Sequence, residues 1–496
     1  MNHLIIAPIV LPAVLAGLIV LLARSSISAQ RLIGAVALLA LLALSVVLLQ
    51  QSGDSPAQAY FLGNWPAPFG IVLILDRLSA LMLVLTAGLA AVIWAYAVAT
   101  RWDTKGGHFH TLFLFQMMGL NGAFLTGDAF NLFVFFEVLL IASYGLMVHG
   151  GGAARLRAGV QYVAFNLLGS TLFLFGLAAI YSVTGTLNMA DLAVKLAMLP
   201  PGDAALVRVA FVMLLMVFAI KGALVPLHFW LPGTYAAAPG PVAALFAVMT
   251  KVGAYAVIRF GTLIVTAPAT DGLWQAYLTP AALGTVALGA VGVLGSHRLA
   301  RRVAFAGIGS MGVVFLAIAA GTPQATSAAL YYMVHSTLAT AALFLVADMI
   351  TPAQGRDDVQ GRGAAASGLI AALFMAAVIA MAGMPPLSGF VAKLLVMDAL
   401  RDDAALMWSV ILLASLLTIL GFARAGSRLF WKPLTDGASA PAQDNPGAIA
   451  AVVALLAAIV GLTVFAGPIT AWLDVTAHTL HVPTGYIAAT ALPVLP

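Results

Sequence analysis

The chain has 496 residues, of which 63% are hydrophobic and only 8% are charged, whereas water-soluble domains average about 45–50% and about 25%. These proportions exclude a water-soluble globule and indicate a membrane protein with many spans. The chain has no cysteine, so it cannot by itself build an iron–sulfur cluster, a cysteine zinc site or a disulfide framework, and any redox centre would belong to a partner. Lysine and arginine outnumber the acids by 22 to 17, but in a lipid-embedded chain the placement of charges is more informative than their sum, and no nucleic-acid partner is expected.

Apolar stretches long enough to cross a bilayer core of about 30 Å as helices recur along the whole chain. Hydropathy and helix breakers together predict an all-α polytopic protein with fourteen transmembrane helices, near 4–23, 32–50, 75–98, 109–127, 129–149, 159–184, 206–231, 239–263, 276–296, 303–321, 326–350, 364–400, 405–423 and 447–472. The loops are short, which leaves no room for a separate soluble catalytic domain. We therefore expect the function to lie within the membrane.

The basic residues are distributed unevenly between the two sides of the predicted bundle. No Lys or Arg precedes the first apolar run, so we expect this run to be retained as a helix and not cleaved as a signal peptide. Fourteen Lys and Arg follow odd-numbered helices and five lie on the other side. By the positive-inside rule this predicts a multi-pass membrane protein with both termini outside the cytoplasm.

Three lysines remain inside predicted spans, namely Lys221, Lys251 and Lys393. The only glutamate of the chain, Glu137, and a histidine, His335, also lie in apolar runs. An ionisable group near a helix centre costs about 2.5–3.5 kcal/mol on insertion scales, so such groups usually serve a function.

The depth of these groups follows from a helical rise of about 1.5 Å per residue. Lys251 stands ten residues after Pro241, and Lys221 stands eleven residues before Pro232, which puts both near the midplane. Glu137 and His335 come out only slightly shallower. We expect a row in the plane of the membrane, which suits a proton relay because the charge of each group shifts the pKa of its neighbour.

Two of the predicted helices, the seventh and the twelfth, are interrupted. The stretch from Lys221 to Pro232 contains Pro226, and a second break is predicted at Gly383-Met-Pro-Pro-Leu-Ser-Gly389. Broken helices are tolerated at membrane depth only where protein or water satisfies the freed backbone groups, and paired breaks in two halves are typical of transport sites.

Simpler interpretations exist for several of these residues. The lysines could extend toward the headgroups or hold helices together, and Glu137 could form a purely structural ion pair. His335 fits a hydrogen-bonded core histidine as well as a proton relay. We interpret His228 as structural or as the mouth of a water path, Asp128 as a helix N-cap, and two pairs, His108 with His110 and His478 with His481, as surface histidines without a third metal ligand. Asp348, Asp357 and Asp358 with Arg356 and Arg362 are interpreted as a solvated face.

Three stretches resemble a known family, namely Gly127 to Tyr144 around Asn-Leu-Phe-Val-Phe-Phe-Glu137, Lys221 to Pro232, and Thr250-Lys251-Val-Gly-Ala-Tyr-Ala-Val-Ile-Arg259. They are similar to the antiporter-like subunits shared by respiratory complex I and the Mrp multisubunit cation/proton antiporters. The segment from Gly63 to Ser79 resembles the external segment that precedes the third helix in this family. The Asn-Leu-Phe-Val-Phe-Phe-Glu form, the length of the chain and a lysine instead of a glutamate at 393 are most similar to the D-type Mrp subunits. The chain departs from many relatives at Gly233-Thr-Tyr235, where an acidic residue or histidine is usual.

The resemblance implies two inverted five-helix repeats, with segments 1–105, 106–265 (helices 4–8), 266–425 (helices 9–13) and 426–496. It also implies a proton route through Glu137, Lys221, Lys251, His335 and Lys393. Accessory positions are His228, Tyr144, Thr250 and Ser310; Ser310 with water would bridge from Lys251 to His335. The implied partners are the other Mrp subunits, of the A, B, C, E, F and G types.

The sequence thus predicts a subunit of a Na⁺(K⁺)/H⁺ antiporter, without cofactor or metal and not an enzyme by itself. In the cycle we expect, Lys221 holds a proton while paired with Glu137. The alternative is a proton-pumping arm of complex I or a membrane-bound hydrogenase, which would co-purify with redox subunits. A third possibility is a scaffold whose charges only lock helices together.

Overall fold

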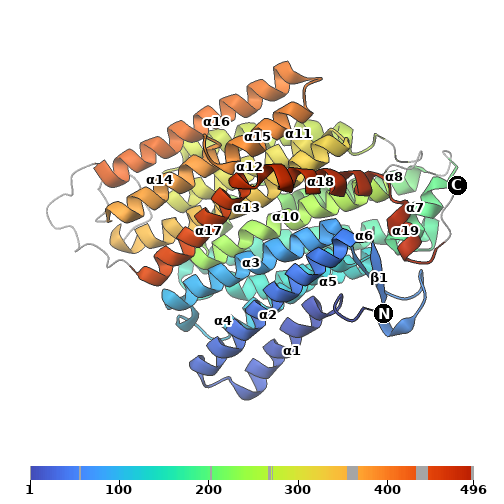
Figure 1. The fold of residues 1–496 in the computed structure, drawn as a ribbon, viewed down its shortest axis with the longest axis horizontal. Helices are drawn as coiled ribbons and strands as arrows, with labels where there is room; N and C mark the ends of the chain where they lie inside the picture. The colour runs from blue at the N-terminus through green and yellow to red at the C-terminus, as the bar shows by residue number, and fades with distance from the viewer. Residues whose placement is uncertain are drawn as a thin grey trace.

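The computed structural model describes residues 2–54, 57–200, 204–265, 270, 272–354, 367–431 and 445–492. Its helices are α1 (Ala7–Leu22), α2 (Ile27–Asp54), α3 (Arg77–Ala99), α4 (Phe109–Leu125), α5 (Ala129–Met147), α6 (Ala153–Thr184), α7 (Met189–Ala197), α8 (Ala205–Gly222), α9 (Trp230–Ala237), α10 (Gly240–Leu263), α11 (Gln275–Gly295), α12 (Leu299–Ala319), α13 (Pro323–Gln354), α14 (Gly368–Ala382), α15 (Ser388–Ala399), α16 (Ala404–Gly426), α17 (Pro446–Val464), α18 (Ala466–His481) and α19 (Thr484–Ala489). Shorter helical turns are η1 (Leu62–Asn64), η2 (Trp102–Thr104) and η4 (Ser427–Trp431). The long helices form one bundle with α10 and α13 near its middle (Figure 1).

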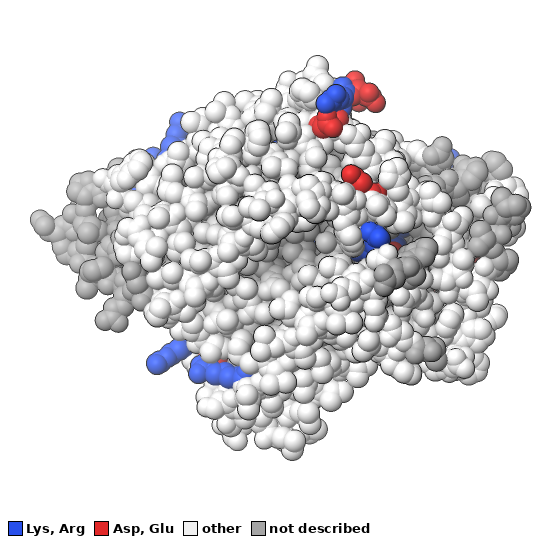
Figure 2. All heavy atoms as spheres, in the orientation of Figure 1, with Lys and Arg blue, Asp and Glu red and all other residues white. Residues whose placement is uncertain are grey.

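The predicted all-helical membrane fold is confirmed. Each of the fourteen predicted segments contains helix, and eleven helices of the described residues are long and apolar enough to cross a membrane. The number of fourteen crossings stays a prediction. The outer helices expose leucines and valines, such as Leu21, Val160 and Leu413, and the face in Figure 2 carries few charged residues. Such a surface suits contact with lipid.

Three features of the fold were not expected. The segment before α3 forms a hairpin of β1 (Gln58–Phe61) and β2 (Val72–Leu75), paired antiparallel. The segment after α6 contains α7, which begins where the Asn188 side chain accepts hydrogen bonds from two backbone amides. The single helix predicted at 447–472 is wrong, because the chain bends at Phe465 and continues as α18. Pro468 lies three residues later and has no amide hydrogen to bond the preceding turn.

Both predicted helix breaks are confirmed. The first half-helix, α8, ends at Gly222, and Ala223 adopts a left-handed conformation with φ of 55°. The second, α14, ends at Ala382, and Gly383 has φ of 76°. At the first break, Trp230 Nε1 donates to the carbonyl of Ile220 at 3.0 Å. Side chains of neighbouring elements thus satisfy backbone groups that an unbroken helix would have bonded itself.

The basic residues of the described chain are divided unevenly: eleven follow odd-numbered predicted helices, against five on the other side. At one end of the bundle lies a pocket that is lined by Arg155 and Arg298, among others. The segments around it are the end of α3, the end of α13 and the α5–α6, α9–α10 and α11–α12 junctions. The opposite end carries the β-hairpin, α7 and α19, and the N-terminus lies at that end too (Figure 1). Of the fourteen basic residues assigned to the cytoplasmic side, Arg356, Arg362 and Lys432 lie outside the described residues, as do Asp357 and Asp358.

The expectation that His110 is a surface histidine is wrong. His110 is buried, where it accepts from Trp94 Nε1 at 3.0 Å and lies 3.2 Å from Asp103. Asp348 is half-buried and lines the pocket with Arg155 and Arg298, and its Oδ2 accepts from Tyr96 and Trp102, each at 2.8 Å. Both residues tie helices together near one end of the bundle. Asp128 caps α5 as predicted, accepting from the Asn131 amide at 2.8 Å.

Candidate functional site

Glu137 and Lys221 are both held by α6. Glu137, on α5, accepts a short hydrogen bond from the Ser170 hydroxyl. The ammonium of Lys221, at the end of α8, donates to Asn166 Oδ1 at 2.7 Å and is only 7% exposed. The Asn166 amide nitrogen donates to the carbonyl of Tyr162 at 2.8 Å, which leaves Oδ1 free to accept from the lysine.

Among the described residues no direct ion pair joins Glu137 to Lys221, and their pairing during the cycle stays a prediction. The carboxylate and the ammonium are each bonded to a neutral side chain, and Ser170 and Asn166 are four residues apart on α6. Residues four apart share one face of a helix. The two charges therefore flank a neutral polar bridge.

Lys251 lies on α10 and is 1% exposed. Among the described residues it has no hydrogen-bond or ion-pair partner. Two residues later, a Cβ on Gly253 would stand 2.6 Å from the Phe218 carbonyl oxygen, so the backbones of α8 and α10 approach closely at this level. Lys221 and Lys251 therefore lie on directly packed helices.

His335, on α13, is bonded to both halves of the second broken helix. Its Nε2 lies 3.1 Å from the Ala380 carbonyl oxygen and its Nδ1 lies 2.8 Å from the Ser388 hydroxyl. A carbonyl can only accept, so Nε2 carries a hydrogen, and in the neutral ring Nδ1 accepts from Ser388. These two hydrogen bonds are those of a fully bonded core histidine. They also allow Nδ1 to take up a proton, because the Ser388 hydroxyl can rotate and accept from it.

Lys393, on α15, completes the series. Its ammonium donates to the Ala382 carbonyl and to the Ser415 hydroxyl, both at 2.8 Å. It also lines a cavity of about 30 Å³ with Ser310, Tyr332 and Thr418, enough for one or two water molecules. Ser310 was expected to bridge Lys251 and His335, but in the structure it lines the same cavity as Lys393.

The helices that carry these groups pack in succession. Helix α5 packs on α6, α6 on α8, α8 on α10, α10 on α13, and α13 on α14 and α15. Helices α5, α8, α10, α13 and α15 each carry one ionisable group of the predicted row. Helix α6 carries the neutral side chains bonded to two of them, and α14 contributes the backbone carbonyls of Ala380 and Ala382. Lys221, Lys251 and His335 are buried, and Glu137 and Lys393 are half-buried. The order along this series is Glu137, Lys221, Lys251, His335 and Lys393.

The accessory positions are less connected. The Thr250 hydroxyl donates to the Ala247 carbonyl of its own helix at 3.2 Å. The ring of Tyr144 packs edge-on against Tyr162, with centroids 5.4 Å apart. His228 is half-buried in the first helix break, and its Nδ1 is buried with no partner among the described residues.

Sequence reasoning missed four neutral residues that bind the charged groups, namely Asn166, Ser170, Ser388 and Ser415. Asn166 and Ser170 could have been found from the sequence, because two polar residues four apart lie on one face of an otherwise apolar helix. Ser388 and Ser415 had none, since single serines are common in transmembrane helices. In the described part of the chain, no group of three or more His, Asp or Glu side chains could hold a metal ion.

Comparisons with known proteins identify the family of the chain. The transmembrane family described as NADH:quinone oxidoreductase/Mrp antiporter matches residues 126–421. A relative from Rhizobium meliloti, named as a probable K⁺/H⁺ antiporter subunit of the D type, is 40% identical over 97% of this chain and 96% of that protein. A relative from Bacillus subtilis, named as a Na⁺/H⁺ antiporter subunit of the same type, is 36% identical over 99% of both chains.

The fold also matches solved structures over nearly its whole length. A chain of the Mrp complex from Dietzia sp. DQ12-45-1b superposes with a TM-score of 0.88 and 29% identity, over 99% of this chain and 100% of that one. A chain of respiratory complex I from Thermus thermophilus gives 0.80 and 26%, over 96% and 99%. By sequence and by fold, the chain belongs to the NADH:quinone oxidoreductase/Mrp antiporter transmembrane family.

Proposed function

We propose that the chain is the D-type subunit of a multisubunit Na⁺(K⁺)/H⁺ antiporter, in which it conducts protons along the row from Glu137 to Lys393, coupled to cation export. The observation that carries the proposal is the unbroken succession of packed helices that each contribute an ionisable group of the row or a group hydrogen-bonded to one. The names of the curated relatives support the antiporter over the redox-enzyme arm, and the chain is a transporter subunit, not an enzyme.

The hydrogen bonds suggest how the row works. Asn166 can accept from a charged Lys221 but cannot take its proton, so it stabilises the ammonium and does not remove the charge. Ser170 donates to Glu137 and so favours the carboxylate. A proton arriving at Glu137 would cancel the negative charge near Lys221, and the lysine would then release its proton toward Lys251 on the adjacent helix.

The proposal extends to topology and partners. The uneven division of the basic residues supports a cytoplasmic location for the segments that follow odd-numbered predicted helices and an extracytoplasmic location for both termini, in the bacterial inner membrane. Two inverted repeats, 106–265 and 266–425, would each contain one broken helix. The partners would be the A, B, C, E, F and G subunits of an Mrp complex, to which the Dietzia structure is the relevant likeness.

Transport in everted vesicles tests the proposal. We expect vesicles with the full complex to show a pH change on addition of Na⁺ or K⁺, and Glu137→Ala or Lys221→Ala to abolish it at normal levels of assembled complex. Thr171→Ala is the matched control, since Thr171 lies next to Ser170 but its hydroxyl bonds its own helix. Full transport by an assembled Glu137→Ala complex would refute the proposal, and co-purification with flavin and iron–sulfur subunits would favour the redox arm.

A further inference from the structure

A pocket of about 460 Å³ opens at the end of the bundle that carries α7 and α19. It is lined on one side by Asp76, Arg259 and Thr262 and on the other by α18 and α19 residues, including Thr479 and Tyr486. None of the five proposed row residues lines it. The volume is enough for many water molecules.

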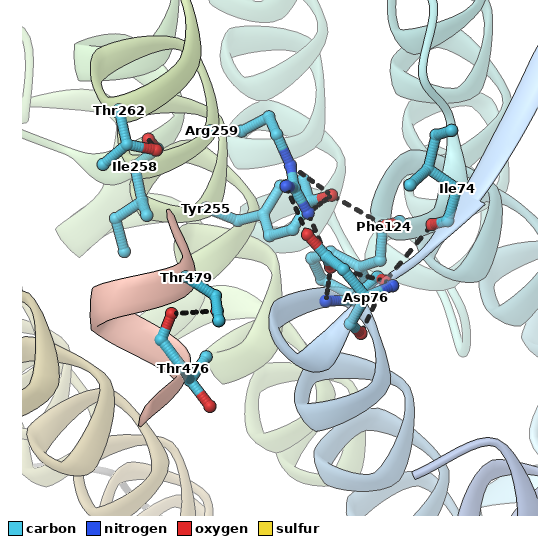
Figure 3. A network of polar contacts seen from close by, with 10 residues as sticks. Ile74, Asp76, Phe124, Tyr255, Ile258, Arg259, Thr262, Thr476 and Thr479 are labelled. Atoms are coloured by element: carbon cyan, nitrogen blue, oxygen red, sulfur yellow. Dashed lines mark hydrogen bonds and ion pairs between the residues drawn. The ribbon is translucent and has the colours of Figure 1, made fainter. Parts of the chain in front are cut away.

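The floor of this pocket is a buried ion pair. Arg259 donates to Asp76 through Nη1 at 2.5 Å and Nη2 at 2.9 Å, and the two side chains are 3% and 8% exposed (Figure 3). Asp76 also caps α3, accepting from the Ser79 amide. Arg259 reaches the Tyr255 hydroxyl at 3.3 Å, and that hydroxyl donates to the Phe124 carbonyl at 2.7 Å. Asp76 and Arg259 line the pocket, whereas Tyr255, which is bonded to Arg259, does not.

The same helix connects this pair to the row. Lys251, Tyr255, Arg259 and Thr262 follow at intervals of four, four and three residues along α10. At 100° per residue they form one stripe on the helix, and the rise from Lys251 to Arg259 is about 12 Å. The stripe runs from the unpartnered Lys251 to the wall of the pocket.

A second, independent observation indicates water in the pocket. Tyr486 lines the pocket and is only 7% exposed. Its hydroxyl is buried and has no hydrogen-bond partner among the described residues. Buried hydroxyls are almost always bonded, to protein or to ordered water. The Arg259 guanidinium also stands 5.0 Å from the Tyr486 ring centroid, a distance for cation–π attraction. Arg259 therefore has a second favourable contact beside Asp76.

We propose that this pocket is the extracytoplasmic port through which protons reach Lys251, and that the Asp76–Arg259 pair is its gate. This inference rests on the proposed function. Protons enter the pocket as hydronium ions, and the positive charge of a hydronium ion beside the Asp76 carboxylate competes with Arg259 for it. The guanidinium keeps all its protons and moves toward the Tyr486 ring. Water then passes Tyr255, and a proton is delivered to the amine of Lys251, which becomes the ammonium.

The absence of cysteine in the chain makes a clean accessibility test possible. In cells with the full complex, Thr262→Cys is exposed from outside to a membrane-impermeant sulfonated methanethiosulfonate, and everted vesicles are then assayed. We expect labelling, and a cation-induced pH change at least fivefold smaller than in the unlabelled sample of the same variant. Ser182→Cys is the control, because Ser182 is exposed in the last turn of α6 outside the pocket; its labelling should leave the rate unchanged.

A double variant tests the gate. Asp76→Asn with Arg259→Gln removes both charges and keeps hydrogen-bonding groups, and we expect at least tenfold slower transport in the assembled complex. The matched control is Asp103→Asn with Arg31→Gln, a carboxylate–guanidinium pair at the other end of α3, which should stay within twofold of the parent.

The outcomes separate this inference from the proposed function. If Thr262→Cys is not labelled from outside, or is labelled without loss of transport, the port is refuted while an inactive Glu137→Ala still supports the row. If the double variant assembles and transports at the parent rate, the gate is refuted. If the parent complex moves no protons in response to cations, the proposed function itself fails. Should the double variant not assemble, the thiol experiment alone decides.

Discussion

Asn166 and Ser170 stand one turn apart on α6, and one holds Lys221 while the other holds Glu137. The only acid of the row and its first lysine are thus linked through neutral groups instead of a salt bridge. Direct contact would fix both charges, because breaking a buried pair costs several kcal/mol. A neutral bridge allows each group to change its protonation state separately.

Replacing Asn166 with Leu should slow transport more than replacing any neighbouring residue on α6. The buried ammonium of Lys221 would lose its side-chain acceptor, and a hydrogen bond to a charged group contributes about 2 kcal/mol. We expect at least a tenfold lower rate of cation-induced pH change in everted vesicles. A rate within twofold of the parent, in a fully assembled complex, would show that Asn166 has no part in the row.

Replacing Ser415 with Ala should impair transport through Lys393. The ammonium would keep the Ala382 carbonyl but lose the second acceptor at 2.8 Å. We expect a several-fold decrease in rate with little change in the amount of complex. Ser409→Ala is the control on the same helix, because Ser409 is exposed and its hydroxyl bonds the Ala405 carbonyl. Equal effects of the two substitutions would contradict a specific role for Ser415.

Gly389→Ala should disrupt the second broken helix. A Cβ there would stand 2.1 Å from the Ala380 carbonyl oxygen and 2.7 Å from His335 Nε2, contacts that real Cβ atoms do not make. We expect loss of assembled complex, or loss of transport, measured by native gel and vesicle assay. Gly461→Ala, in α17 with nothing within 4 Å, should be neutral or stabilise the helix by up to about 1 kcal/mol. Normal assembly and transport of Gly389→Ala would show that this packing is not required.

The stability of the complex should fall in acid through Asp76. Burial alone would raise the pKa of Asp76, but the charge and hydrogen bonds of Arg259, with those of Ser79, lower it below its ordinary value. The Asp76–Arg259 pair therefore makes its full contribution to the stability of the folded complex above the pKa of Asp76 in the unfolded chain, about 3.9. This contribution is lost as the pH falls through the lower pKa of Asp76 in the folded complex. Thermal unfolding of purified complex followed from pH 7 to below pH 4 checks this.

The comparison for the acid experiment is the Asp76→Asn, Arg259→Gln complex. It should lack the part of the acid loss that Asp76 causes. A loss confined to pH 5–7, or one identical in both complexes, would be inconsistent with a lowered pKa at Asp76.

Most of the fold could be predicted from the sequence, because twenty-residue apolar runs and prolines dictate where helices lie and break. Pro226 and the pair Pro385-Pro386 marked both breaks. The bend at Phe465 was missed because hydropathy continues across it, although Pro468 was visible. His110 was misplaced because its partner Trp94 lies on another helix.

The candidate site was predictable only in its charges. An isolated Glu or Lys in an apolar run is conspicuous, so the five row residues could be chosen from sequence. The neutral groups that bind them depend on which helix faces which, and no periodicity reports that. The pairing of Glu137 with Lys221 during the cycle stays a prediction, and nothing in the sequence indicated that Ser170 and Asn166 would bond the two charges in this structure.

The contact of Lys393 with the Ala382 carbonyl has a mechanical consequence. Ala382 is the last residue of α14, and the C-terminal end of a helix carries a partial negative charge of about one half, which attracts a cation. When the amine is neutral it can still donate a hydrogen bond, but this attraction disappears. Loading and unloading one proton would therefore tighten and loosen the joint between two half-helices, turning a chemical event into a small displacement that an adjoining protein could sense.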